Sequence, residues 1–255
     1  MMRLEYKFLI ENDRLSSLRS DLAPFVEADA FAQARSPQQY VVRSIYFDTH
    51  DLECYFQKIE GIPVRRKLRI RGYNELDKTS VIFLEIKKKY GSATMKFRSP
   101  LHYGNLDKLL QTNAVERYVI SENGSQEPID NGRRFLYHLM RKSLRPTVLV
   151  VYDREPYHCK FNPHLRITFD KNLRHRIFPT TQCLFNDTGL KASLANHFIL
   201  EIKFTLGFPD WLQSIIRRYD VTRQALSKYT ICLGQHSCAK PLTRTKNRIL
   251  SQSLL

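Results

Sequence analysis

The stretch KLRIRGYN at residues 67–74 decides the fold that we expect for this chain. Lys67, Arg69 and Arg71 alternate there with two aliphatic residues. Successive side chains of a β-strand point to opposite faces, so the three cations share one face and the aliphatic side chains share the other. The stretch therefore predicts a strand with a cationic face. That face is either wetted by solvent or holds an anion.

The whole chain carries an excess of positive charge. Its 255 residues include 41 Lys and Arg against 25 Asp and Glu, which gives a formal net charge of +16. The hydrophobic content of 42% is ordinary for a globular protein, and the length suits one large domain or two small ones. The charge predicts a polyanionic partner: nucleic acid, an acidic membrane or phosphate compounds.

Cysteine usage and the two ends of the sequence give further expectations. The five cysteines form no Cys-x-x-Cys pair, so we expect a reduced, cytoplasmic protein. The opening residues contain no signal peptide or anchor, and no later segment is apolar over the length that a bilayer requires. From His236 the sequence is polar and basic with little periodicity. We therefore expect a single domain over 1–235 and a basic, flexible tail over 236–255.

Seven stretches alternate between apolar and charged residues, as strands with one buried face do. They are 4–8, 67–71, 81–89, 94–99, 149–154, 165–170 and 198–204. Apolar residues at helical spacing predict helices within 11–25, 105–110, 133–144 and 209–226. Strands outnumber helices and follow one another through short turns, so we expect an α+β fold with an antiparallel sheet.

The charged faces of these strands hold many more cations than carboxylates. The residues are Glu5, Lys7, Lys67, Arg69, Arg71, Glu85, Lys87, Lys89, Lys96, Arg98, Arg154, Arg166, Asp170, Glu201 and Lys203. On any single strand, solvation explains such a face, because surface ion pairs contribute little. Over seven strands, cations stand beside cations, which costs free energy unless an anion binds. If the sheet curls into a barrel, these side chains line its lumen, where arginine suits phosphate oxygens.

Nucleic acid is the alternative polyanion. A surface that binds it usually adds exposed aromatic side chains or a recognisable motif, and we find no zinc-finger, helix-turn-helix or RNP-like sequence. The GxxxxGK[ST], GxGxxG, HExxH and GxSxG motifs are also absent from the sequence. The alternation of cations along strands favours a phosphate compound over nucleic acid.

An ordered set of motifs resembles the VTC domain, the polyphosphate polymerase branch of the CYTH-like triphosphate tunnel metalloenzymes. The motifs are LEYKFLI (4–10), SIYFDT (44–49), KLRIRGY (67–73), FLEIKKK (83–89), MKFR (95–98), VVYDRE (150–155), LRITFD (165–170), LEIKF (200–204) and SKY (227–229). The resemblance implies an antiparallel β-barrel tunnel with a charged lumen, flanked by α-helices. It also implies transfer of the ATP γ-phosphate to a growing polyphosphate chain with a divalent metal, Mn²⁺ or Mg²⁺.

The resemblance implies site residues as well. The residues that would bind phosphate and act in catalysis are Lys7, Arg69, Arg71, Lys87, Lys96, Arg154, Arg166 and Lys228. Glu201 would hold the metal. The alternation alone adds Lys67, Lys89, Arg98 and Lys203 as further contacts for ATP or phosphate. Glu5 either ligates the metal or orients Lys7 by an ion pair, and the sequence leaves both roles open.

The start of the motif set separates two branches of the superfamily. Hydrolases and cyclases of this fold typically begin with ExExK, whereas this chain has Arg3 at the position of the first acid. Fewer carboxylates favour the polymerase, because phosphoryl transfer to an ionised phosphate depends on positioning and charge neutralisation. A triphosphatase of the same fold and a non-catalytic polyphosphate-binding module are the alternatives. We expect ATP and polyphosphate or pyrophosphate as partners, with no nucleic acid; a membrane-protein partner is compatible with the sequence.

Three further residues are expected to be structural. Asp48 in YFDT is predicted to shape the turn after a strand. Trp211 is predicted to pack a helix, and Glu85 to balance the neighbouring lysines.

Overall fold

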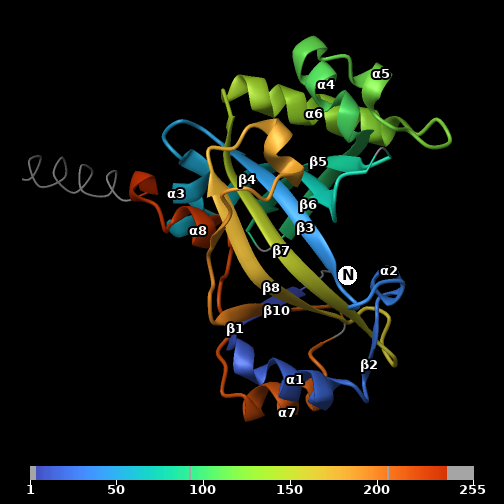
Figure 1. Cartoon of the computed structure of the whole chain (residues 1–255), viewed down its shortest axis with the longest axis vertical. Helices are drawn as coiled ribbons and strands as arrows, with labels where there is room; N and C mark the ends of the chain where they lie inside the picture. Colours follow the sequence, from blue (N-terminus) through green and yellow to red (C-terminus); the bar gives the residue numbers. More distant parts are fainter. Residues whose placement is uncertain (1–3, 78, 92, 206, 240–255) are drawn as a thin grey trace, which may run out of the picture.

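The computed structural model describes residues 4–77, 79–91, 93–205 and 207–239, which form one large antiparallel sheet covered by helices (Figure 1). Its main strands, in spatial order, are β1 (Leu4–Glu11), β10 (His197–Phe204), β8 (Arg166–Ile177), β7 (Arg145–Cys159), β3 (Tyr40–Asp48), β4 (Val64–Tyr73), β5 (Val81–Tyr90) and β6 (Ala93–His102). Short strands β2 (Val26–Ala28) and β9 (Lys191–Ala192) pair with β7 and β8. The predicted α+β class and antiparallel sheet are therefore confirmed.

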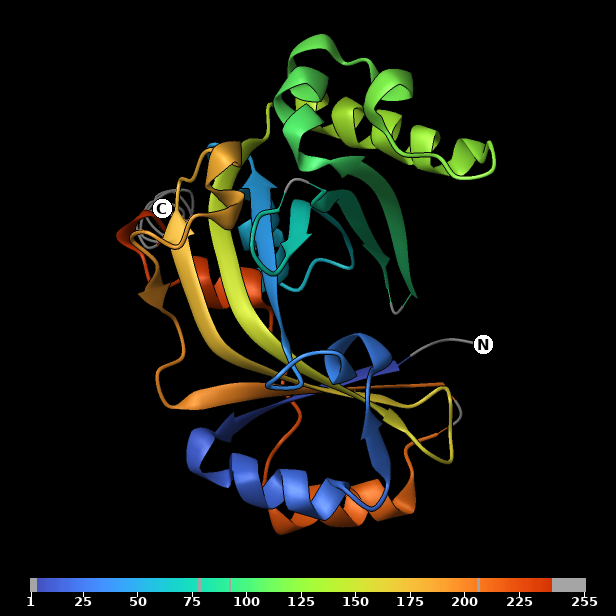
Figure 2. The ribbon, with the colours of Figure 1, turned by 45° about the vertical axis from the view of Figure 1, so that its right-hand side comes forward.

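The sheet bends strongly (Figure 2), and its two ends approach each other. Lys87 on β5 lies close enough to Glu5 on β1 to affect its pKa. Burial raises that pKa, but positive charges that include Lys87 lower it below its ordinary value. No strand pairing joins β1 to β6 within the described residues, so the sheet is curled but not closed by backbone hydrogen bonds. The outer edge of β1 instead meets an irregular segment. The backbone N–H of Gln224 in this segment donates a hydrogen bond to the backbone carbonyl of Lys7 at 2.9 Å.

Two groups of helices cover the convex face of the sheet. The helices α1 (Leu15–Leu22) and α7 (Asp210–Arg218) bury apolar residues against β1, β10 and β8, with Phe8 and Leu200 in the shared core. The helices α4 (Leu106–Thr112), α5 (Val115–Tyr118) and α6 (Gln126–Arg141) cover the half formed by β3 to β6. Leu68 and Ile70, the aliphatic residues of the KLRIR stretch, are buried beneath this second group.

Two other helices, α3 (Glu53–Ile59) and α8 (Lys228–Leu233), pack on the concave face, and α8 buries Tyr229 against β3 and β7. Asp48 holds this arrangement together. Its carboxylate accepts hydrogen bonds from the amides of Cys54 at 2.8 Å and Tyr55 at 3.0 Å, and from the Tyr229 hydroxyl. The predicted turn role of Asp48 is confirmed, and the carboxylate also anchors α8. Trp211 packs as predicted, with its ring stacked on Phe25 at 4.2 Å.

Several predicted elements differ from the structure. The helix predicted over 209–226 ends at Arg218, because Asp220 has a left-handed φ of +48° and the chain then leaves the helix. The helix predicted within 11–25 starts only at Leu15, after the 3-10 turn η1 (Asn12–Arg14). β3 is not among the seven alternating stretches, although a strand was expected before Asp48, because both of its faces are largely buried, which removes the alternation.

The end of the described chain packs on the domain. Within the predicted tail, η4 (Ser237–Ala239) is a 3-10 turn, and His236 Nε2 lies 2.6 Å from His175 Nε2. Residues 240–255 lie outside the described residues. In the part of the chain that the structure describes, no helix combines the length and the apolar character needed to cross a membrane.

Candidate phosphate-binding site

The predicted site residues lie on seven strands and one helix and come together on the concave face. The strands contribute Glu5 and Lys7 (β1), Lys67, Arg69 and Arg71 (β4), Lys87 and Lys89 (β5), Lys96 and Arg98 (β6), Arg154 (β7), Arg166 (β8), and Glu201 and Lys203 (β10), while α8 contributes Lys228. Strand alternation sends these side chains away from the helix-covered cores. Lys96 and Arg98 lie at the exposed margin formed by β6.

Glu85 lies among three arginines, a group that we call the Glu85 cluster. Its carboxylate is 2.7 Å from Arg69 Nε, 3.3 Å from Arg98 Nε and 3.6 Å from Arg71 Nε. Burial raises the pKa of Glu85, but the three guanidinium groups outweigh burial and lower it to about 2. The carboxylate is therefore ionised at neutral pH, where it offsets one of three positive charges. Its predicted balancing role is confirmed, but its ion-pair partners are arginines and not the predicted lysines.

A second cluster surrounds Glu201, which is only 5% exposed. Its carboxylate forms ion pairs with Lys203 and with Lys7, the latter at 3.5 Å. Burial raises the pKa of Glu201, but Lys7, Lys203 and other nearby cations lower it well below its ordinary value. Glu5 lies 2.8 Å from Lys7 Nζ, which matches the second of its two predicted roles. Its role as a metal ligand stays a prediction.

Asp170 is a residue of this site that sequence reasoning placed on the charged face but did not assign to the site. It is 1% exposed and accepts two hydrogen bonds from Arg154, at 2.7 and 2.8 Å. Lys228 reaches the same carboxylate from the first turn of α8. Its ammonium lies 4.5 Å from the centre of the Tyr152 ring. The signal for Asp170 was available: it shares a strand face with Arg166 in LRITFD.

Three lysines stand side by side on β4, β5 and β6, and we call them the lysine row. Lys67 pairs in register with Lys87, and Lys87 pairs with Lys96. Like charges directly opposite each other on neighbouring strands are destabilising. Burial, together with the charges of Lys58, Lys87 and Lys7, lowers the pKa of Lys67 to about 7. An anion bound on this row would relieve the repulsion.

Buried polar atoms without hydrogen bonds lie on the same face. They are Arg71 Nε, Arg166 Nε, Thr168 Oγ1 and Ser44 Oγ. Arg166 otherwise makes only long contacts, at 3.5 Å to the Asp29 carboxylate and the Tyr40 hydroxyl. A buried donor or acceptor left unsatisfied costs free energy. These atoms are therefore suited to a ligand rich in hydrogen-bonding oxygens.

The carboxylates suit a metal only in part. No group of three His, Cys, Asp or Glu residues within the described chain is arranged to hold a metal ion. Glu201 and Glu5 offer the oxygen ligands that Mg²⁺ and Mn²⁺ prefer, although lysines pair with both. The donor set fits a metal that takes most of its ligands from phosphate and water, and does not fit a preformed protein cage.

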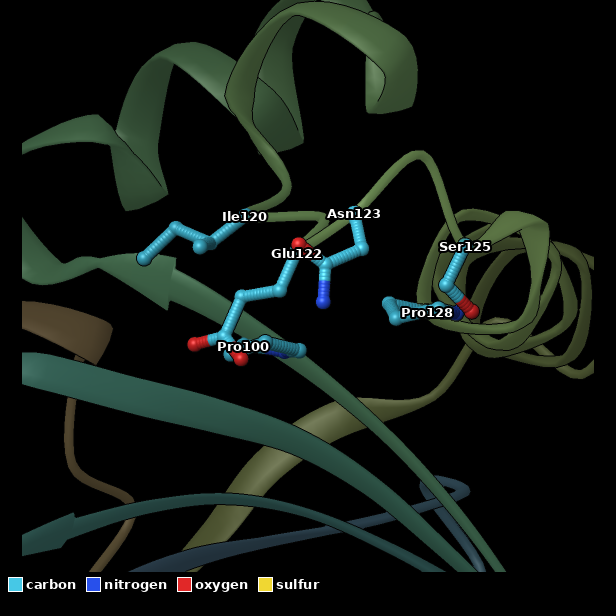
Figure 3. A pocket seen from close by; sticks show the side chains of 6 residues that line it. All are labelled: Pro100, Ile120, Glu122, Asn123, Ser125 and Pro128. Atoms are coloured by element: carbon cyan, nitrogen blue, oxygen red, sulfur yellow. The ribbon is translucent and has the colours of Figure 1, made fainter.

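A hollow elsewhere on the molecule contributes nothing to this site. It has a volume of about 470 Å³ and lies beside the end of β6 (Figure 3). Its lining consists of Pro100, Ile120, Glu122, Asn123, Ser125 and Pro128, none of which is a cation. This hollow therefore offers no cationic side chain to an anion.

The family of the chain follows from comparison with known proteins. A family model described as the VTC domain matches residues 2–236. The chain belongs to the VTC domain family. This VTC domain is 24% identical over 145 residues to the vacuolar transporter chaperone complex subunit 4 of Schizosaccharomyces pombe. That match covers 52% of this chain and 20% of the yeast protein, so the domain spans only a fraction of its relative.

A solved structure also resembles this VTC domain. The PH1819 protein from Pyrococcus horikoshii OT3 matches with a TM-score of 0.46 and 15% sequence identity, over 91% of this chain and 100% of the other.

Proposed function

We propose that this VTC domain is a polyphosphate polymerase that transfers the γ-phosphate of ATP to the end of a growing polyphosphate chain. The observation that supports it best is the lysine row beside the Glu85 cluster: three lysines stand in register on neighbouring strands, on a face with unsatisfied buried polar groups. Membership of the VTC family supports a role connected with polyphosphate.

In the proposed polymerase, the concave face forms one wall of a tunnel for the phosphate chain. The helix α8 covers part of that face, and the irregular segment 221–227 borders its open edge. Lys7 and Lys67 donate hydrogen bonds to this segment, to the Leu226 carbonyl at 3.3 Å and to Ser227 Oγ at 2.9 Å. A phosphate chain lying between the segment and the strands would be surrounded by cations. That geometry suits a linear polyanion.

The proposed mechanism relies on positioning and charge neutralisation. A terminal phosphate oxygen is already ionised at neutral pH, so the attack requires no strong general base. Arg69, Arg71, Arg154 and Arg166 hold the donor phosphates, and the lysine row holds the chain. Their charges offset the negative charge that develops on the bridging oxygen as its bond to the γ-phosphorus breaks. Glu201, with Glu5, would hold a Mn²⁺ or Mg²⁺ ion that shares phosphate oxygens and adds to this neutralisation.

The test is an incubation of the purified chain with ATP and Mn²⁺, followed by a gel that separates long polyphosphate from free phosphate. Arg69→Ala and Glu201→Gln are each expected to lower chain formation by at least about 100-fold, as removal of one preorganised charge at a reacting centre does. Lys108→Ala removes an exposed cation on α4 and is the matched control, with wild-type activity expected.

Other outcomes would overturn the proposal. Free phosphate without chains would identify a triphosphatase of the same fold. Tight polyphosphate binding without turnover under Mn²⁺, Mg²⁺ or Co²⁺ would identify a binding module. Because the yeast relative is a subunit of a complex, we extend the proposal to a protein partner for this domain, and the same assay with added membrane fractions would test it.

A further inference from the structure

Four aromatic rings form a row at one end of the concave face. Phe31 comes from the short helix α2 (Ala30–Gln33), and Tyr40, Tyr73 and Phe83 come from β3, β4 and β5. The centres of neighbouring rings lie 5.2, 5.8 and 6.1 Å apart, and each pair meets edge to face. We call these residues the aromatic row. They connect a surface helix to the strands that bear the phosphate-binding arginines.

The aromatic row touches the arginines of the site directly. Arg166 Nη2 is 3.5 Å from the Tyr40 hydroxyl, and Arg98 Nη2 is 3.3 Å from the Tyr73 hydroxyl. The Arg98 guanidinium also lies 3.4 Å from the centre of the Phe83 ring. A ligand whose phosphates bind these guanidinium groups therefore places its next chemical group on the aromatic row.

The outer member of the row is open to solvent. Phe31 is 51% exposed although it is a large apolar side chain, and the Arg35 guanidinium lies 5.1 Å from its ring centre. The lysine row lies farther along the same strands, towards the start of β4 and the end of β5. One end of the site thus combines rings with arginines, while the other is built mainly from lysines. A ligand with both an aromatic group and phosphates matches the first end.

We infer that Phe31, at the open end of the aromatic row, is a stacking site for the purine ring of a nucleoside triphosphate, with the triphosphate directed towards Arg71 and Arg166. The inference rests on the proposed function for the identity of the donor. Every nucleobase has a π face that can stack on an aromatic side chain, so stacking discriminates only weakly between one base and another. ATP and GTP are therefore expected to bind alike, and both more tightly than inorganic tripolyphosphate.

The test is a calorimetric titration of the full chain with ATP and, separately, with inorganic tripolyphosphate at the same Mg²⁺ concentration. Phe31→Ala is expected to weaken ATP binding about tenfold and to leave tripolyphosphate binding unchanged, because stacking on one ring is lost. Phe31→Trp is expected to retain ATP binding. Phe178→Ala is the matched control, since Phe178 is 61% exposed on another part of the surface.

The outcomes separate this inference from the proposed function. Equal loss of both ligands in Phe31→Ala, or loss of neither, would overturn the stacking site even if the wild type makes polyphosphate. Selective loss of ATP binding in a chain that forms no polyphosphate would support the stacking site and contradict the polymerase.

Discussion

Two neighbouring rows of side chains on β4, β5 and β6 differ in their charge pattern. In the first row Arg69, Glu85 and Arg98 lie side by side. Two positions along the same strands, all three places are lysines: Lys67, Lys87 and Lys96. The first row has a carboxylate, that of Glu85, at its central position, and the second has the ammonium of Lys87 there. The same three strands carry both rows, so the central residue, Glu85 in one row and Lys87 in the other, decides whether a row contains a carboxylate.

The comparison distinguishes cations that also stabilise the fold, through Glu85, from cations whose charges repel one another until an anion binds. The Glu85 carboxylate binds guanidinium groups that would otherwise repel one another, so that row stabilises the unliganded domain. The lysine row adds repulsion to the unliganded domain and loses it when an anion binds. Charge count alone cannot separate these roles, because both rows appear in sequence as alternating cations.

The largest expected effect is that of removing the counter-charge from the first row. Glu85→Ala is expected to lower the free energy of unfolding by about 3 kcal/mol, because a partly buried ion-pair network loses its carboxylate. Urea denaturation measures the loss, and added tripolyphosphate should recover part of it. Glu116→Ala breaks an exposed pair with Arg133 and should have no measurable effect. A loss in Glu85→Ala no larger than in this control would refute the comparison.

A smaller effect is expected from the titration of Lys67, whose pKa is lowered to about 7 by burial and neighbouring cations. A bound polyanion raises that pKa, so binding above pH 7 must take up a proton. Affinity for tripolyphosphate should fall roughly tenfold between pH 6 and pH 8 because of this group. Lys67→Met lacks this group, so the change of affinity with pH that remains in this variant comes from the titration of the ligand itself.

Calorimetry at pH 8 in buffers of different ionisation enthalpy would count the proton taken up. Equal uptake by the wild type and by Lys67→Met would contradict the assignment. In the unliganded protein the effect of rising pH is opposite, because the titration of Lys67 raises stability where it lowers the affinity for a polyanion. Between pH 7 and the ordinary lysine pKa the unfolded chain binds more protons at this residue than the folded one, so this group makes the domain more stable as pH rises.

The smallest expected effect is on the stability of the lysine row itself. Lys87→Met should raise the free energy of unfolding of the unliganded domain by about 0.5 kcal/mol, because it removes repulsion between cross-strand neighbours. The same change should weaken tripolyphosphate binding. Arg69→Met should lower both stability and binding. Urea denaturation and calorimetry on the two variants would test this contrast, and a destabilised Lys87→Met would show that the row is structural.

The faces of the strands could be predicted from the sequence, because alternation is local. The shared face of Lys67, Arg69 and Arg71 follows from the two-residue period of an extended chain alone. Their partners do not, because register between strands decides that Glu85 meets Arg69 while Lys87 meets Lys67. A slip of two residues would keep every side chain on its face and place Lys67 opposite Glu85, and the alternation does not distinguish the two registers.

Contacts from distant parts of the chain were also beyond local patterns. Lys228 reaches Asp170 only because α8 folds back onto the concave face, and the family resemblance was the only signal for it. Asp48 looked like a turn residue, and its bond to Tyr229 depends on the same packing. The closed barrel was implied by the family resemblance, yet within the described residues β1 meets the segment containing Gln224 and does not pair with β6.

The pairing of β1 with β10 has a consequence for how the domain is made. Lys7 and Leu226 are hydrogen-bonded across a separation of 219 residues, and Asp48 and Tyr229 across 181. At ribosomal rates the first strand precedes its partner by on the order of ten seconds or more. Contacts of such long sequence separation also slow folding after release. The anion-binding face is therefore completed late, and a nascent chain without β10 and α8 has many of its lysines but neither Glu201 nor Lys228.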